Sequence, residues 1–158
     1  MRRLAIKSLA ILALWASQAV AGDAPAVLRV TGQIANGPIL LDFSQLRDLP
    51  QIGIETSTVV TDGTHRFTGF LMRDLLEHLD AQGDRVMATG LNDYVVDIPA
   101  SDFMQFDVII AHSMDGKALD RADKGPLWII YPRDDHTELQ DIRYDYRWVW
   151  QLSEIEVK

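Results

Sequence analysis

The 158-residue sequence has no cysteine and few basic side chains. Without cysteine the chain forms no disulfide, holds no metal through a thiolate and has no cysteine nucleophile. Its 15 Lys and Arg residues are outnumbered by 23 Asp and Glu residues, which gives a formal charge of -8. Nucleic-acid-binding proteins usually present a basic face, so this balance argues against DNA or RNA as a partner.

Long apolar runs are also missing. A membrane-spanning helix needs about 20 apolar residues, and the apolar run Leu9–Trp15 is shorter than that. Basic residues precede this run and the small residues Ala19–Ala21 follow it, which is the pattern of a secretory signal peptide. We therefore expect a signal peptide at residues 1–21 and a mature protein, not embedded in a membrane, at residues 22–158.

The mature part would be more acidic than the whole chain. Residues 1–21 contain three basic residues and no acidic one, so their removal leaves 12 basic and 23 acidic residues, a formal charge of -11. The pair Arg2-Arg3 leaves both the general and the twin-arginine export routes open.

Short strands separated by turn residues are expected through most of residues 22–158. About seven segments alternate or are rich in β-branched residues. The clearest of them are residues 27–34, 51–60, 86–89, 94–98, 108–114 and 127–131. Asp115-Gly116 is a favoured pair for a two-residue type I′ hairpin turn.

One amphipathic helix interrupts the strands. Met72, Leu75, Leu76 and Leu79 recur at helical spacing, and Gly83 is expected to end the helix. Shorter helical stretches are expected at residues 44–49, with Asp42 or Ser44 as the cap, and at residues 101–106. No linker or repeat divides the chain, so the sequence predicts a single α+β domain in which sheet dominates.

Three phrases in this order carry a family resemblance: Gly69–Leu76, Asn92–Pro99 and Met114–Pro132. Their content and spacing resemble the molybdopterin-binding domain of sulfite oxidases and related periplasmic oxidoreductases. The resemblance covers most of residues 27–157. It implies the sulfite-oxidase-like fold and a periplasmic location.

The chain departs from these enzymes at one position of chemical importance. The family's enzymes hold molybdenum through a cysteine in the loop after a strand like residues 51–56, whereas Ser57 and Thr58 stand in that loop here. A neutral hydroxyl does not replace a soft anionic sulfur, so molybdenum is not expected. The sequence is more similar to short, cysteine-free periplasmic members of this fold, some of which bind a metal-free pterin and signal its presence.

The resemblance therefore implies a non-catalytic pterin-binding protein. Its partner would be the periplasmic domain of a membrane signalling protein, to which it relays the state of the ligand. The alternative from another class is an enzyme, either a molybdopterin-dependent oxidoreductase without the usual cysteine ligand or a hydrolase that uses Asp134, Asp135 and His136. A third alternative is an interaction protein whose ancestral pocket is filled by side chains.

The segment 131–138 has the side chains that a pterin ring requires. A carboxylate matches the donor edge of the ring, and Asp134 or Glu138 is expected to supply it. Arg133 suits the acceptor edge. A solvated loop with a surface ion pair from Arg133 is the competing interpretation, and a divalent-cation site is a further one, although adjacent residues rarely converge on one ion.

The family phrases add candidates from other loops. Thr58 lies in the loop that replaces the cysteine, and Asn92, Asp93 and Tyr94 match a phrase that lines the family's cavity. An Asx turn alone also explains Asn92 and Asp93. Arg147 is expected either to contact a pterin tail or to form an ion pair with Asp145.

Aromatic residues and histidines complete the set. Trp128, Trp148 and Trp150 are expected mainly in the core, with Trp150 the one that would line the pocket because it matches a family tryptophan. The scattered histidines His65, His78 and His112 are expected to face solvent.

Overall fold

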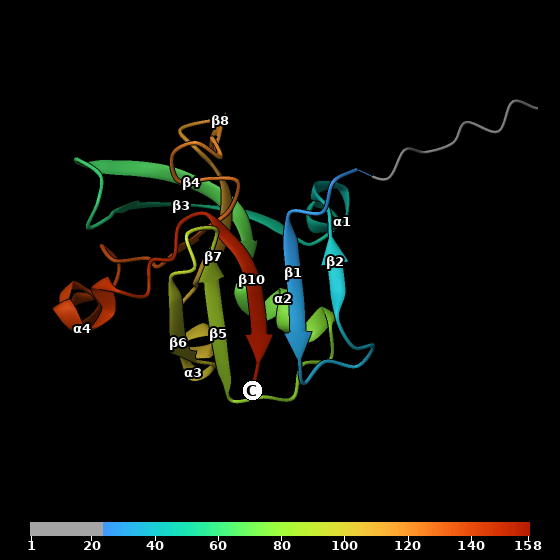
Figure 1. Ribbon diagram of the computed structural model, residues 1–158. Coiled ribbons are helices and arrows are strands. Elements are labelled where there is room, and N and C mark those ends of the chain that lie inside the picture. The colour runs from blue at the N-terminus through green and yellow to red at the C-terminus, as the bar shows by residue number, and fades with distance from the viewer. Residues whose placement is uncertain (1–23) are drawn as a thin grey trace, which may run out of the picture.

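The computed structural model describes residues 24–158, so the expected signal peptide lies outside the described residues. Two five-stranded sheets are flanked by short helices (Figure 1). β1 and β10 of the first sheet run parallel, and its other neighbouring strands are antiparallel. In order across the first sheet, the strands are β2 (Ile39–Leu41), β1 (Leu28–Gly32), β10 (Leu152–Val157), β5 (Arg85–Gly90) and β6 (Val95–Pro99).

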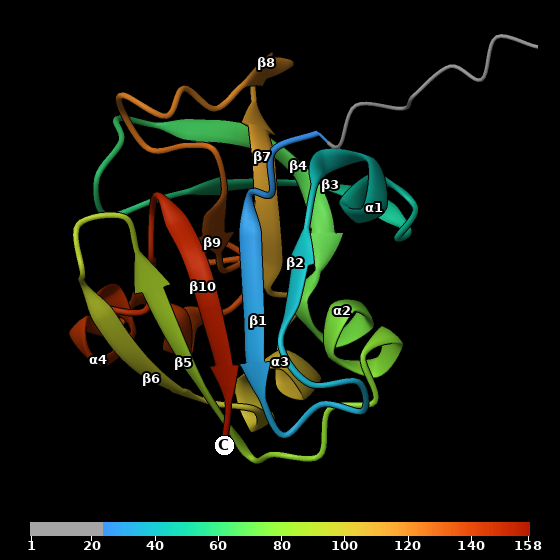
Figure 2. The ribbon, with the colours of Figure 1, turned by 45° about the vertical axis from the view of Figure 1, so that its right-hand side comes forward.

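The second sheet is entirely antiparallel. Figure 2 shows its long β3–β4 hairpin crossing above the strands of the first sheet. Asp115 and Gly116 both have positive φ, 50° and 76°, as a type I′ turn requires, which confirms the predicted hairpin. The strands are β3 (Gln51–Ser57), β4 (Thr64–Leu71), β7 (Ile109–Met114) and β8 (Lys117–Ala118), with β9 (Trp128–Ile130) paired to β7.

The helices are short. They are α1 (Phe43–Arg47), α2 (Met72–His78), α3 (Ser101–Gln105), the 3-10 helix η1 (Thr137–Gln140) and α4 (Ile142–Asp145). Asp42 caps α1 by accepting hydrogen bonds from the backbone N–H groups of Ser44 and Gln45. It is one of the two residues that were predicted to cap this helix. Among residues 24–158, no helix has the length and apolar character needed to cross a membrane.

The predicted end of α2 was wrong. The helix stops at His78, and Asp80 follows in the left-handed region with φ 48°. A short polar residue can take the position that glycine usually occupies after a helix. Gly83 has a different role: a Cβ there would lie 2.2 Å from the carbonyl oxygen of Lys158, so only glycine permits this close backbone approach.

Both sheets contribute to one continuous hydrophobic core. Trp128 and Trp148 are buried in it, as expected, and Trp150 is 37% exposed. Leu75 of α2 is fully buried, which confirms the predicted inner face of this helix. The structure thus has the sheet-dominated, single-domain α+β fold predicted from the sequence.

The prediction of solvent-facing histidines was wrong for two of the three. The His65 ring lies 2.7 Å from the Asp115 carboxylate and 2.9 Å from the carbonyl oxygen of Asp62. His112 is partly buried beside Gln51, and burial, followed by the nearby Arg47 charge, lowers its pKa. Sequence spacing did not reveal these contacts, because each joins different strands or turns.

Candidate functional site

The predicted site residues lie on one flank of the molecule. This flank contains the β3–β4 loop, the segment from Arg133 to Arg147 and the turn between β5 and β6, all on the left in Figures 1 and 2. Direct hydrogen bonds join several of these parts, for example Ser57 to Asp134 and Tyr94 to Tyr146. The fold therefore brings together segments that are far apart in the sequence.

Asp134 fastens two of these segments to each other. One carboxylate oxygen accepts from the Ser57 hydroxyl at 2.6 Å and the other accepts from the Ser57 backbone N–H at 2.7 Å. These bonds, the side-chain bond first, hold the pKa of Asp134 below its ordinary value. The carboxylate expected to be available for a pterin is thus already engaged in holding the loop where the family's enzymes carry cysteine.

Glu138 is the freer of the two predicted carboxylates. One of its oxygens accepts a hydrogen bond from the Gln105 side chain of α3 at 2.8 Å. The other oxygen accepts none from the described residues, and the side chain is exposed. Glu138 is therefore better placed than Asp134 to accept hydrogen bonds from the donor edge of a ring.

Arg133 differs from the other arginines of this flank. The surface ion pair considered for it does not form, and its guanidinium has no hydrogen-bond partner in the part of the chain that the structure describes. Its Nε is buried and unpaired, as is the Nε of Arg147, but Arg133 alone of these arginines has no ion pair among the described residues. A buried donor without a partner costs free energy, about 1 to 3 kcal/mol, so this group is suited to an acceptor that the protein itself does not provide.

Arg147 takes part in a buried polar cluster and does not form the expected ion pair with Asp145. It forms an ion pair with Asp102 of α3 instead of Asp145, so the expected pair was wrong. The Tyr131 hydroxyl donates to the same Asp102 carboxylate at 2.9 Å. Burial, followed by the Asp102 charge, raises the pKa of Tyr131. Burial alone would lower the pKa of Arg147, but hydrogen bonds to Tyr146 and Asp102 raise it.

The turn between β5 and β6 has the Asx geometry that was considered for it. The Asn92 side chain accepts from the Tyr94 backbone N–H at 3.3 Å, and Asp93 has φ 61°. The Tyr94 hydroxyl donates to the carbonyl oxygen of Tyr146 at 3.2 Å, which places the exposed Tyr94 ring beside α4. Local turn geometry thus accounts for Asn92 and Asp93, while Tyr94 remains available at the surface.

Trp150 lines a small hollow at the edge of this flank. The hollow has a volume of about 280 Å³ and is also lined by Val60, Asp123 and Lys124. Lys124 is paired with Asp123 at 2.8 Å. Small-molecule sites usually measure about 300 to 1,000 Å³, so the hollow is close to the lower end of that range. An exposed Trp face, a carboxylate and an ammonium are suitable groups for a flat polar ring.

Thr58 closes the loop beside Trp150. Its hydroxyl lies 2.7 Å from that of Thr61 and accepts from the backbone N–H of Val60 at 3.2 Å. The side chain is buried, at 7% exposure. Thr58 therefore shapes the loop from within and positions Val60 at the hollow.

A cation site does not form from the acidic segment. In residues 24–158, no three His, Asp or Glu side chains converge as ligands for a metal ion. His136, which was considered as a ligand or base, packs edge-on against Phe106 with ring centroids 5.0 Å apart. Within residues 24–158 this segment therefore has no assembled set of three ligands for a divalent cation.

Comparison with known proteins defines the family. Residues 25–157 match the family described as the oxidoreductase molybdopterin binding domain, so the chain belongs to this family. Its structure is similar to the crystal structure of the sulfane dehydrogenase SoxCD from Paracoccus pantotrophus, with a TM-score of 0.63 and 16% sequence identity. The match covers 82% of this chain and 37% of that chain. No curated protein sequence matches the chain significantly.

These findings confirm the predicted fold and its sulfite-oxidase-type family. At 16% identity the structural likeness shows the fold alone, and the chain spans little more than a third of SoxCD's matched chain. The family assignment indicates a domain of the molybdopterin-binding oxidoreductase type. The periplasmic location, the absence of metal and the signalling role stay predictions.

Sequence reasoning gave no partner role to several polar residues at this flank. Ser57 is the partner of Asp134, Asp102 is the partner of Arg147, and Asp123 with Lys124 lies beside Trp150. The charged run at residues 120–124 was a visible signal for the last pair. No local signal marked Asp102, which the sequence indicated only as the start of a short helix.

Proposed function

We propose that this protein is an exported, non-catalytic binding protein for a metal-free pterin. The observation that carries the proposal is Arg133, a side chain in the predicted pterin segment whose buried Nε has no partner. A pterin presents carbonyl and ring-nitrogen acceptors that satisfy an arginine donor. Glu138 of the same segment has a carboxylate oxygen without a described partner, and Trp150 presents a partly exposed ring face in the hollow that it lines with Val60, Asp123 and Lys124.

The residues do not fit molybdenum. The family's enzymes use a thiolate, and the sequence has no cysteine at any position. Ser57 donates its hydroxyl to Asp134, and the Thr58 hydroxyl is bonded inside the loop. Neither group is an anionic donor directed at a metal, so the organic part of the cofactor is the better match to this flank.

A protein that binds a ligand without changing it acts through a second interaction. The ligand must then favour one partner state over the other. We propose the periplasmic domain of a membrane signalling protein as that partner, in line with the secretory pattern at residues 1–21 and the family resemblance. The mature charge of -11 suits a partner with a basic surface.

Elemental analysis and calorimetry test the proposal together. The protein would be purified from the compartment to which it is exported, and molybdenum would be measured per chain. Tetrahydrobiopterin and neopterin would then be titrated as one reduced and one oxidised pterin. We expect no stoichiometric molybdenum and a micromolar or tighter dissociation constant for at least one pterin, about -8 kcal/mol.

Two results would contradict the proposal. One molybdenum per chain would favour the alternative of an oxidoreductase with an unusual ligand. No heat with either pterin, in protein first unfolded and refolded to remove bound ligand, would favour a pocket filled by side chains. Each result points to a different alternative, so the experiment separates them.

A further inference from the structure

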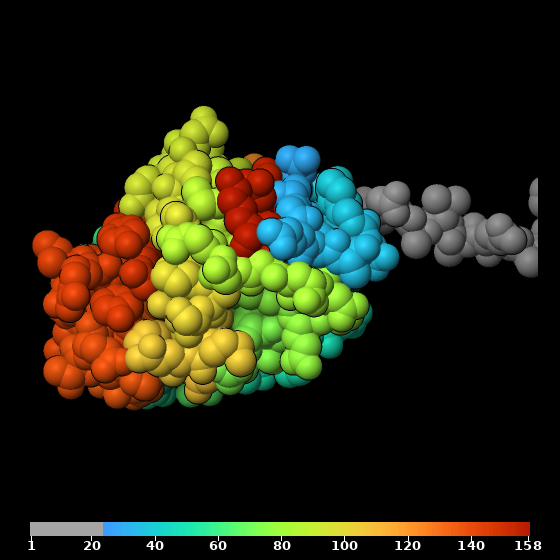
Figure 3. Space-filling view, turned by 90° about the horizontal axis from the view of Figure 1, so that it is seen from below, coloured from blue at the N-terminus to red at the C-terminus, as the bar shows by residue number. Residues whose placement is uncertain are grey.

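The largest hollow described lies away from the candidate pterin site. It has a volume of about 680 Å³ and lies between α2, the following loop and α3. Figure 3 shows this underside, where the green surface of α2 and its loop meets the yellow surface of α3. None of the predicted pterin-binding residues lines it. It therefore requires a separate explanation.

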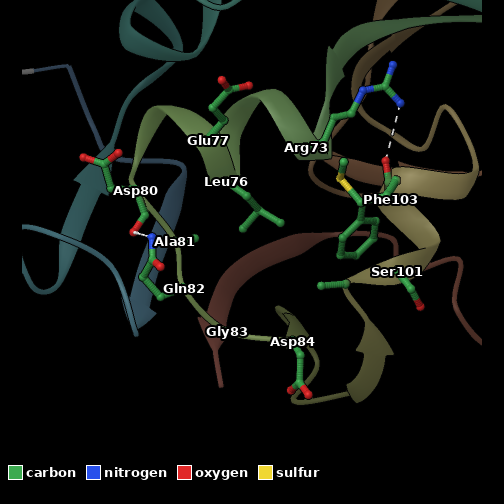
Figure 4. A pocket seen from close by; sticks show the side chains of 12 residues that line it. Arg73, Leu76, Glu77, Asp80, Ala81, Gln82, Gly83, Asp84, Ser101 and Phe103 are labelled. Carbon is green, nitrogen blue, oxygen red and sulfur yellow. Dashed lines mark hydrogen bonds between the residues drawn. The ribbon is translucent and has the colours of Figure 1, made fainter.

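The hollow has an apolar floor. Leu76 of α2 and Phe103 of α3 point toward each other across it (Figure 4), and Ala81 and Ala100 add small apolar groups. Met104 also lines it and is 74% exposed. Methionine adapts its shape to a partner and is frequent at protein-binding surfaces. The hollow is thus an apolar groove with a flexible side chain at its edge.

Acidic residues lie at the edge of the groove, and Figure 4 shows the carboxylates of Glu77, Asp80 and Asp84 directed outward from it. Glu77, Asp80 and Asp84 line its margin, and none of them has a cationic partner among residues 24–158. Arg73 is the one basic residue among the described residues that line the groove. It is paired with Asp107 at 2.7 Å. The margin therefore has an uncompensated negative charge next to apolar surface.

We propose that this α2–α3 groove binds a basic, amphipathic helix of a partner protein. Apolar side chains of that helix would replace water over Leu76 and Met104, beside the buried Phe103, as in other helix-in-groove interactions. Lysine or arginine on its flanks would meet the acidic margin, and this complementarity speeds encounter and weakens with salt. The inference rests on the proposed function in one respect, because that function includes binding to a partner protein.

A model peptide tests the groove directly. The probe is a dye-labelled, 14-residue helical peptide with leucine on one face and lysine on the other, and binding is followed by fluorescence anisotropy without pterin. We expect Met104→Ser to weaken binding about tenfold. The double variant Glu77→Lys and Asp84→Lys should weaken it by a similar factor, about tenfold.

Matched variants distinguish the groove from general attraction to an acidic protein. Ile142 is 79% exposed on α4, so Ile142→Ser removes an equally exposed apolar side chain elsewhere. The double variant Asp48→Lys and Asp62→Lys reverses two exposed acids that have no ion-pair partner within the described part of the chain, so its charge change equals that of the groove variant. Neither change should alter peptide affinity by more than about twofold.

Several outcomes would overturn the proposal. Equal losses in the groove variants and the controls would show non-specific charge attraction, and no binding at low salt would exclude the helical partner. A dimer in sedimentation that Met104→Ser dissociates would make a second copy of this chain the occupant. Pterin titration of Met104→Ser keeps the two proposals separate, because this variant should bind pterin like the parent.

Discussion

At the residue scale, Asp102 is a buried carboxylate that depends on its hydrogen-bond and ion-pair partners. It is 6% exposed and accepts hydrogen bonds from both Tyr131 and Arg147. A buried carboxylate is tolerated only when such partners compensate its charge. The same carboxylate connects α3 to the strand end at Tyr131 and to the chain beyond α4, so one residue holds three segments together.

We expect Asp102→Ala to destabilise the protein by about 3 to 5 kcal/mol, because it leaves the Arg147 guanidinium without its counter-charge. Urea unfolding followed by circular dichroism measures the change. Asp97→Ala is the control, since Asp97 forms an exposed pair with Arg85 at 2.8 Å. That variant should lose at most about 1 kcal/mol. Similar losses in both variants would show that burial of the ion pair is unimportant.

Arg133 is expected to act on ligand affinity rather than on stability. Arg133→Gln removes the charged donor, and we expect pterin binding to weaken by about 1.5 to 3 kcal/mol in calorimetry. The melting temperature should not fall, because Arg133 has no described partner to lose. Arg143→Gln, at an exposed arginine paired with Asp141, serves as the control. Unchanged affinity in Arg133→Gln would place the ligand elsewhere.

At the element scale, the β3–β4 loop is tied to the β7–β8 turn through His65. Both ring nitrogens of His65 face acceptors, the Asp115 carboxylate and the Asp62 carbonyl oxygen. Only the protonated imidazole donates from both nitrogens. The hydrogen bond to Asp115 is the main cause that raises the pKa of His65 above 6.5, and the same bond lowers the pKa of Asp115.

This contact predicts a pH-dependent loop. A raised histidine pKa stabilises the fold fully below the unfolded value of 6.5, and the contribution is lost as pH rises through the folded value. Relative to His65→Gln, the parent's melting temperature should therefore fall as pH rises above about 6.5, a comparison in which the opposite contribution of His112 cancels. His78→Gln, at an exposed histidine of α2, should retain the parent's slope. Identical slopes in all three proteins would contradict the assignment.

Elements with local signals were predictable from the sequence. The Asp115-Gly116 hairpin is specified by its two turn residues, and the buried face of α2 by the spacing of Met72 and Leu75. The end of α2 was not predictable in this way, because Asp80 takes the left-handed position while the glycine three residues later is required by contact with Lys158. That contact exists only in the folded chain.

The sequence predicted which residues belong to the candidate site better than it predicted how they are arranged. Family resemblance and residue chemistry selected Arg133, Asp134 and Glu138. The partners of Asp134 and Arg147 come from distant positions: Ser57 is 77 residues from Asp134, and Asp102 is 45 residues from Arg147. No periodicity or turn rule determines which carboxylate is engaged at such separations. The structure was needed to show that Asp134 is bonded and Arg133 is not.

At the scale of the whole molecule, α3 contacts both proposed surfaces. Ser101, Phe103 and Met104 line the groove, whereas Asp102 and Gln105 bond to Arg147 and Glu138 at the candidate pterin site. Because these residues belong to one five-residue helix, a displacement of α3 would change both surfaces. Ligand and partner can influence each other through this helix if each prefers one of its positions.

The last prediction is that pterin and the helical peptide bind with linked affinities. Saturating tetrahydrobiopterin should change the dissociation constant of the peptide by about 5-fold or more, and saturating peptide should change that of the pterin by the same factor. Gln105→Ala removes the hydrogen bond between α3 and Glu138, so it should reduce the factor while the peptide still binds. Gln140→Ala changes an exposed residue of η1 and should leave the coupling factor unchanged. A factor of one in the parent protein would show that the two surfaces act independently, which would exclude a relay through α3.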